Sequence, residues 1–214
     1  INVIARRRSV RPLLKRTLPR AEALVSVSRP LGTELEALGV APDRIHLVKN
    51  GVDVSLFRPR DKGAARRELG LDETRPTILF CGRLEAQKGL GELLAAFTRV
   101  RSARPDAVLA LVGDGAMRAE VDALREKLGG ALVAPGPRPL PEVAKWMAAC
   151  DVFTLPSWAE GTPNVVLEAL ASGRPAVGSD VGGIPDVLHD PRSGLVVPAK
   201  NDVALAEGLL AALA

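Results

Sequence analysis

From Pro76 onward, short apolar runs rich in Val and Leu alternate with segments whose apolar residues recur at helical spacing. The runs expected to form strands lie near residues 77–80, 108–112, 132–134, 152–155, 176–178 and 195–197. The segments expected to form helices lie near residues 89–103, 116–128, 140–149, 164–172 and 202–213. Because the strand runs are continuously apolar rather than alternating, we expect them to be buried on both faces of a sheet. The pattern therefore predicts an α/β fold, a Rossmann-like, doubly wound parallel sheet with helices on either side.

Polar, glycine-containing segments follow four of the expected strands. They are Gly82-Arg83, Gly113-Asp114, residues 156–161 and residues 180–183. In doubly wound sheets, ligands bind beyond the carboxyl ends of the strands, where the strand order reverses. The four segments are therefore predicted to converge on one ligand-binding crevice.

The composition is that of a globular protein with one good core, because 47% of the 214 residues are hydrophobic and 25% are charged. No stretch approaches 18 uninterrupted apolar residues and no secretory leader opens the sequence, so we expect a cytoplasmic protein. Cys81 and Cys150 each stand beside an apolar run and are interpreted as small buried residues without chemistry. His46 and His189 have no carboxylate or nucleophile at motif spacing, and we expect structural roles for both.

Positive charge is concentrated at the start of the chain. Residues 1–20 contain no acidic residue, and their basic residues are Arg6, Arg7, Arg8, Arg11, Lys15, Arg16 and Arg20. Such a run is usually a solvated face or tail, but a basic amphipathic stretch can also bind anionic lipid. Peripheral membrane contact through residues 1–20 is therefore a second hypothesis. Nucleic acid is not expected as a partner, because aromatic residues make up only 3% of the chain and no recognised module is present.

The first 50 residues are organised differently, so we divide the chain into residues 1–50 and residues 51–214. After a basic, helix-like start, the pattern predicts a strand, a helix and a second strand near residues 24–27, 30–38 and 45–48. A turn is predicted at Asn50-Gly51-Val52-Asp53, between the two units. If the strand at 24–27 is exposed, it can pair with another copy, and a homodimer is therefore a hypothesis.

The most informative segment places two carboxylates, Glu160 and Glu168, eight positions apart across an expected loop-to-helix junction. Thr162 is predicted to be the N-cap and Pro163 the first helical residue, where its missing N–H costs nothing. The backbone N–H groups of residues 164–166 would then point out of the positive end of the helix, which favours a phosphate. A carboxylate so close to a phosphate would repel the ligand unless it faced hydroxyl groups. The segment therefore indicates a phosphorylated, polyhydroxylated ligand such as a nucleotide sugar.

Four motifs in a fixed order resemble those of one family. Residues 156–188, PSWAEGTPNVVLEALASGRPAVGSDVGGIPDVL, closely resemble the Glu-x7-Glu signature of the family 4 glycosyltransferases, which are retaining enzymes of the GT-B fold. Residues 82–89, GRLEAQKG, look like the diphosphate-binding loop of that family, and residues 112–115 and 50–53 also fit its pattern. The resemblance covers about residues 20–214. It implies that residues 1–50 end the acceptor-side domain, most of which is absent, and that residues 51–214 form the donor-binding domain.

The loop after the first long strand carries two cations, Arg83 and Lys88, between Gly82 and Gly89. The glycines would let the backbone approach a diphosphate while the two cations close on it with charge-assisted hydrogen bonds. By resemblance, both cations would neutralise the departing nucleoside diphosphate in place of a metal. The sequence contains no Asp-x-Asp and no clustered His or Cys, and we expect neither a metal nor a cofactor.

The resemblance assigns the ribose hydroxyls to Glu168 and the transferred sugar to Glu160. Glu160 is the expected catalytic residue, either as a nucleophile or, as we favour, as a stabiliser of positive charge. Backbone amides around Gly161, Thr162, Pro163 and Asn164 are expected to line the phosphate or sugar, although capping alone would explain Thr162.

Two glycine-containing turns complete the expected crevice. Gly113 and Asp114 are interpreted as a wall of the nucleotide pocket, with simple turn chemistry as the alternative. Residues 182–186, GGIPD, match the second glycine loop of the family but have Asp186 where Glu is frequent, so their contact stays open.

The function expected from these residues is transfer of a sugar from a nucleoside diphosphate sugar to an acceptor, with retention. The alternatives are a GT-B sugar-nucleotide epimerase and a non-catalytic nucleotide-sugar-binding module. A dinucleotide-dependent dehydrogenase is disfavoured because no Gly-x-Gly-x-x-Gly follows the first strand. The sequence indicates neither the sugar, nor the base, nor the acceptor.

Overall fold

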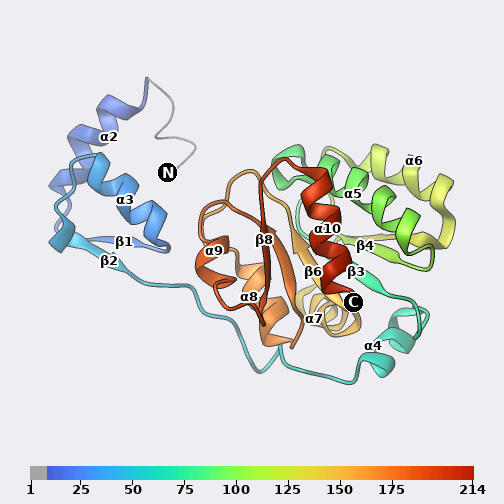
Figure 1. Ribbon diagram of the computed structural model, residues 1–214. Coiled ribbons are helices and arrows are strands. Elements are labelled where there is room, and N and C mark those ends of the chain that lie inside the picture. Colours follow the sequence, from blue (N-terminus) through green and yellow to red (C-terminus); the bar gives the residue numbers. More distant parts are fainter. Residues whose placement is uncertain (1–8) are drawn as a thin grey trace.

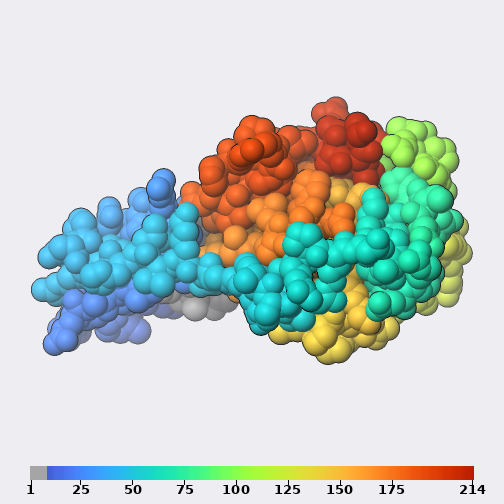
Figure 2. All heavy atoms as spheres, turned by 90° about the horizontal axis from the view of Figure 1, so that it is seen from below, coloured from blue at the N-terminus to red at the C-terminus, as the bar shows by residue number. Residues whose placement is uncertain are grey.

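The computed structural model describes residues 9–214, which form a small N-terminal unit beside a larger α/β domain (Figure 1). Arg6, Arg7 and Arg8 of the basic segment lie outside the described residues. Figure 2 shows the N-terminal unit, in blue, projecting to one side of the larger domain.

The N-terminal unit contains a two-stranded parallel sheet of β1 (Leu24–Ser26) and β2 (Ile45–Leu47), connected through α3 (Arg29–Ala37). Helix α2 (Arg11–Thr17) precedes it. Within α2, Arg11 forms an ion pair with Glu34 of α3 at 3.2 Å. The sheet leaves Val25 62% exposed, beside its exposed cross-strand neighbour His46.

The larger domain contains a six-stranded sheet in which every neighbouring pair is parallel. Its strands are β3 (Thr77–Cys81), β4 (Val108–Val112), β5 (Leu132–Gly136), β6 (Val152–Leu155), β7 (Ala176–Ser179) and β8 (Gly194–Val197). Their order across the sheet is β5-β4-β3-β6-β7-β8, so the order reverses between β3 and β6. This arrangement confirms the predicted Rossmann-like, doubly wound parallel sheet.

Helices cover both faces of the six-stranded sheet. They are α4 (Lys62–Leu69), α5 (Leu90–Ala103), α6 (Arg118–Leu128), α7 (Leu140–Ala149), α8 (Asn164–Ala171), α9 (Ile184–Val187) and α10 (Asp202–Ala212). Short 3-10 turns occur at η1 (Leu18–Arg20), η2 (Pro42–Arg44), η3 (Ala86–Lys88) and η4 (Gly129–Ala131). Helices α5 and α10 pack together over one face, whereas α7 contacts β3 and α8 contacts β6 from the other (Figure 1).

The core lies on both sides of the central strands, as continuous apolar runs predict. All residues of β3, β4 and β6 are buried. The phenyl rings of Phe80, Phe97 and Phe153 are completely buried, and each contributes roughly 1.5–3 kcal/mol of hydrophobic free energy to folding.

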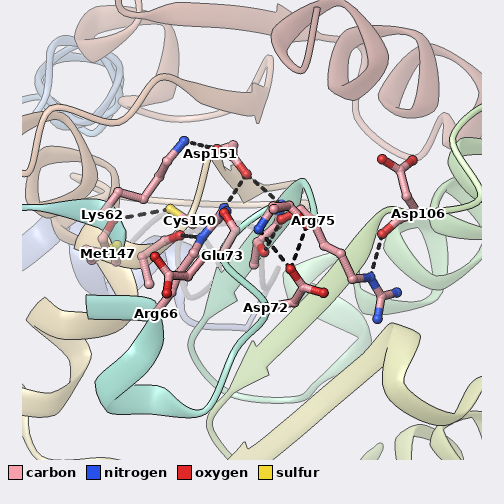
Figure 3. A network of polar contacts seen from close by, with 12 residues as sticks. Lys62, Arg66, Asp72, Glu73, Arg75, Asp106, Met147, Cys150 and Asp151 are labelled. Carbon is pink, nitrogen blue, oxygen red and sulfur yellow. Dashed lines mark hydrogen bonds and ion pairs between the residues drawn. The ribbon is translucent and has the colours of Figure 1, made fainter. Parts of the chain in front are cut away.

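A polar network fixes α4 against the amino ends of β3 and β6 (Figure 3). Arg66 is 2% exposed, and its guanidinium donates to Asp151 Oδ2 at 2.6 Å and to the carbonyl oxygen of Ala149 at 2.8 Å. Lys62 Nζ lies 2.6 Å from Asp151 Oδ1. Burial alone would raise the pKa of Asp151, but hydrogen bonds from Lys62 and Thr77 and the charge of Arg66 lower it. The edge of the sheet opposite the expected crevice is therefore closed by an ion-paired cluster.

Two local predictions were wrong. No turn forms at residues 50–53, where the chain is irregular. The turn lies at residues 54–56 instead. It forms there because the Asp53 carboxylate accepts hydrogen bonds from Ser55 N and Oγ at 2.9 and 2.6 Å. Helix α4 was not expected, although Asp61 caps its start through Ala64 N and Gly70 ends it with φ 68°.

Candidate nucleotide-sugar site

The loops after β3 and β4 are joined by backbone hydrogen bonds. Gly82 N donates to the Val112 carbonyl oxygen and Leu84 N to the Asp114 carbonyl oxygen, both at 2.9 Å. Gly113 has φ 141°, and a Cβ atom at this position would lie 1.9 Å from the Gly82 carbonyl oxygen. Only glycine allows the two loops to approach this closely.

The loop after β3 also meets the loop after β6, where the strand order reverses. The backbone carbonyl oxygen of Gln87 accepts a hydrogen bond from Trp158 N at 2.9 Å. Gly89, with φ 69°, would place a Cβ atom 1.9 Å from the carbonyl oxygen of Pro156. The predicted convergence of these segments at one edge of the sheet is therefore observed.

Lys88 and Glu160, predicted to bind different parts of a ligand, are paired with each other. Lys88 Nζ lies 2.6 Å from Glu160 Oε1, and the side chains are 23% and 12% exposed. Ser157 Oγ donates to the same carboxylate oxygen at 2.6 Å. The carboxylate thus has two donors in a partly buried position, where removing one partner is costly.

Arg83 does not join this pair. Its side chain is 67% exposed and its Nη1 lies 2.8 Å from Glu85 Oε1 on its own loop. An exposed ion pair of this kind contributes only about 0–1 kcal/mol, so Arg83 can exchange partners easily. Asp114 is also exposed and accepts a hydrogen bond from Gly115 N at 2.9 Å, which is ordinary turn chemistry.

Glu168 lies on α8, close enough to β3 for its charge to act on the thiol of Cys81. Burial raises the pKa of Glu168 above its ordinary value. Its carboxylate makes no hydrogen bond or ion pair with any residue from 9 to 214. Cys81 itself is buried and free, and burial raises its pKa to about 12.

The range predicted for this helix, near residues 164–172, matches the start of α8, but its predicted capping residues were wrong by one residue. The helix begins at Asn164, with Pro163 as N-cap at ψ 80°. Thr162 does not cap it, and its hydroxyl donates to the Val27 carbonyl oxygen at 2.6 Å. A contact with the N-terminal unit, distant in sequence, has replaced the local cap that the pattern predicted.

The amide groups at this helix start are also less free than predicted. Asn164 N donates to the Thr162 carbonyl oxygen at 3.0 Å and Val166 N to that of Pro163 at 2.9 Å. The Asn164 side chain accepts a hydrogen bond from Asn50 Nδ2 at 2.8 Å. Of the three predicted amides, only that of Val165 has no acceptor among residues 9–214.

The second glycine loop packs directly against the loop that carries Glu160. Gly183 N donates to the Gly161 carbonyl oxygen at 2.8 Å. Gly182 has φ 56°, and a Cβ atom there would lie 2.0 Å from the Glu160 carbonyl oxygen. These glycines hold the Glu160 loop from its other side.

Sequence reasoning missed Ser157 and Trp158 as neighbours of Glu160. Ser157 has no motif spacing that would single it out. Trp158 offered a weak signal, since aromatic residues make up only 3% of the chain and one of them stands inside the signature segment.

The described part of the chain contains neither a metal-binding cluster nor a membrane-spanning helix. Between residues 9 and 214, no three His, Cys, Asp or Glu side chains are grouped so that they could hold a metal ion. No helix in this part combines the length and the apolar character needed to cross a bilayer.

A doubly wound sheet with glycine loops, a lysine and two carboxylates gathered where the strand order reverses defines a Rossmann-like α/β domain. The family model described as Glycosyl transferases group 1 matches residues 75–214, and that described as Glycosyltransferase Family 4 matches residues 4–56. The chain therefore belongs to the group 1 glycosyltransferases, with the GT-B type of fold.

Curated relatives agree with this assignment. A D-inositol 3-phosphate glycosyltransferase from Segniliparus rotundus is 40% identical over 162 residues, which cover 73% of this chain and 36% of the relative. An alpha-maltose-1-phosphate synthase from Mycolicibacterium smegmatis is 35% identical over 205 residues, covering 89% of this chain and 52% of the relative. The chain thus spans between about a third and a half of these relatives' length.

Solved structures share the fold. A sucrose-phosphate synthase from Thermosynechococcus elongatus superposes with a TM-score of 0.84 at 27% identity, covering 95% of this chain and 52% of that one. HepE from Anabaena, solved in complex with UDP-glucose, has a TM-score of 0.76 at 23% identity, covering 94% and 57% of the two chains.

Proposed function

We propose that this chain is the donor-binding half of a retaining glycosyltransferase that uses a nucleoside diphosphate sugar. One observation carries the proposal. Two carboxylates lie where the strand order of a group 1 glycosyltransferase sheet reverses. Glu160 is paired with Lys88, and Glu168 has no partner among residues 9–214. A half-buried carboxylate without a partner costs folding free energy, and a ligand that donates hydroxyl protons to it accounts for its presence.

In the proposed complex, Lys88 turns from Glu160 to the diphosphate, and Arg83 leaves Glu85 to join it. Both cations then neutralise the charge that develops on the leaving group, which is the role a metal would otherwise fill. Glu168 accepts hydrogen bonds from the ribose hydroxyls. Glu160, released from Lys88 but still bonded to Ser157, faces the transferred sugar and stabilises positive charge on it.

Similar proteins support a nucleoside diphosphate sugar as the substrate. The HepE structure contains UDP-glucose, which favours a uridine nucleotide as the first donor to test. The relatives named above are a D-inositol 3-phosphate glycosyltransferase, an alpha-maltose-1-phosphate synthase and a sucrose-phosphate synthase. Acceptor screens should therefore begin with phosphorylated polyols and sugars.

Calorimetry on the folded chain tests donor binding. We expect UDP to bind in the millimolar range or tighter, and Lys88→Gln to weaken it about tenfold because a charge-assisted hydrogen bond is lost. Lys145→Gln is the matched control, since Lys145 pairs with Glu68 on the outside of α7 and α4. A folded chain that binds neither UDP, ADP nor GDP at millimolar concentration would contradict the proposal.

The role of Glu160 is tested by turnover in the full-length enzyme. Glu160→Gln is expected to lower kcat by at least about 100-fold while UDP affinity changes little, because only a transition-state interaction is removed. An equal loss in both quantities would show that Glu160 serves nucleotide binding instead.

A further inference from the structure

Trp158 stands two residues before Glu160, in the irregular loop that follows β6. Three separate segments hold it. Its backbone N donates to Gln87 of the diphosphate loop at 2.9 Å, and its indole Nε1 donates to Glu92 Oε1 of α5 at 3.1 Å. Lys200 Nζ lies 4.3 Å from the centre of its ring.

The indole lies beside a hollow, and two charged side chains contact it. The ring borders a hollow of about 350 Å³, whose apolar wall includes Gly91, Ala95 and Met117. A ring beside such a hollow has room to turn, because few atoms oppose its movement on that side. The hydrogen bond to Glu92 and the cation above the ring are the contacts that select one orientation.

Glu92 and Lys200, which contact the ring, each have a feature that lowers the stability of the fold. Glu92 Oε2 is buried and has no hydrogen-bond partner among residues 9–214. Lys200 is the non-glycine residue with positive φ, at 59°, in the described part of the chain. An unsatisfied buried oxygen costs about 1–3 kcal/mol and a left-handed backbone about 1 kcal/mol or more. Costs of this kind are typical of side chains retained for a function.

We infer that Trp158 is a positioning residue for Glu160. Its contacts with Glu92 and Lys200 hold the loop so that the Glu160 carboxylate, bonded to Ser157, faces the sugar. This inference rests on the proposed function of Glu160. Only Ala159, which is exposed, separates the two residues, so we expect a shift of Trp158 to move Glu160. The backbone bond to Gln87 does not depend on the side chain, and nucleotide binding is therefore separable from sugar positioning.

The test is a double-mutant cycle in the full-length enzyme, with kcat, donor KM and UDP affinity as readouts. Trp158→Phe keeps a ring under Lys200 but loses the indole N–H, and Glu92→Ala removes the acceptor. Each is expected to lower kcat about tenfold and to change KM and UDP affinity less than about threefold, and the double variant is expected to be no slower than the singles. Glu92→Gln, whose amide oxygen still accepts from the indole, should retain kcat within about threefold.

Several outcomes would overturn the inference. Unchanged kcat in Trp158→Phe or Glu92→Ala would do so, as would additive losses in the double variant or a matching loss of UDP affinity. If Trp158→Phe does not fold, as judged by thermal melting, Glu92→Ala and Glu92→Gln decide the question on their own. Glu160→Gln is measured in parallel. If Glu160→Gln retains turnover, the proposed function of Glu160 is wrong. If Glu160→Gln is inactive and Trp158→Phe is fully active, only the inference about Trp158 is wrong.

Discussion

Glu168 illustrates, for a single residue, a conflict between stability and proposed function. It is half-buried and has no partner in the described part of the chain, and burial raises its pKa. A carboxyl group whose pKa is higher in the folded state favours folding while it is protonated in both states. That contribution is lost as the pH rises from the ordinary value of about 4.5 through the folded-state pKa.

We therefore expect Glu168→Gln to unfold at a higher temperature than the parent chain near pH 7. The difference should shrink as the pH falls toward 4, where the carboxyl group of the parent is neutral. The same substitution should weaken UDP binding about tenfold, because the neutral amide accepts ribose hydroxyl protons less well. Melting curves between pH 4 and 8 with parallel calorimetry measure both effects, and a destabilised variant with intact UDP affinity would refute the assignment.

At the scale of the elements, strands and long helices were predictable and loop contacts were not. Strands β4 and β6 and helix α7 have the predicted bounds, because continuous apolar runs and helical spacing are local properties. The capping role predicted for Thr162 at the start of α8 was wrong, and its hydroxyl instead bonds to the distant Val27. The pairing of Lys88 with Glu160 was missed for the same reason, since no local pattern records a contact between different loops.

Two glycines at the start of α5 provide a matched test of how the β3 and β6 loops meet. Gly89→Ala would force a positive φ on a residue with a Cβ and bring that atom against the Pro156 carbonyl oxygen. We expect the free energy of unfolding to fall by more than about 2 kcal/mol, and UDP affinity to fall with it. Gly91→Ala meets no atom within 4 Å and should be neutral or stabilising by up to about 1 kcal/mol. Urea unfolding compares them, and equal effects would refute the proposed close contact.

Among residues 9–214, two hydrogen bonds join the N-terminal unit to the larger domain. Thr162 Oγ1 bonds to Val27, and Asn50 bonds to Asn164, so both contacts end at the segment that carries the Glu160 loop into α8. We therefore expect a change in the position of the N-terminal unit to alter the proposed sugar site before other parts of the larger domain.

Thr162→Val removes the hydroxyl without changing the shape of the side chain. We expect faster amide hydrogen exchange in β1 and at residues 160–164, because a hydrogen bond worth about 0.5–1.5 kcal/mol is lost, while exchange in β3 and β4 stays unchanged. Thr98→Val is the control, since its hydroxyl bonds to Leu94 within α5 at 3.1 Å. Unaltered exchange in β1 would show that the bond does not hold the units together.

The reversal of strand order also determines when the crevice can form during folding. Ile78 of β3 pairs with Val152 of β6, across the longest chain separation of any neighbouring strands in the six-stranded sheet. Joining distant segments is slow because a large loop must close first. During synthesis, one edge of β3 therefore stays unpaired until β6 has been made. A chain interrupted before β6 would have an aggregation-prone edge and no binding site.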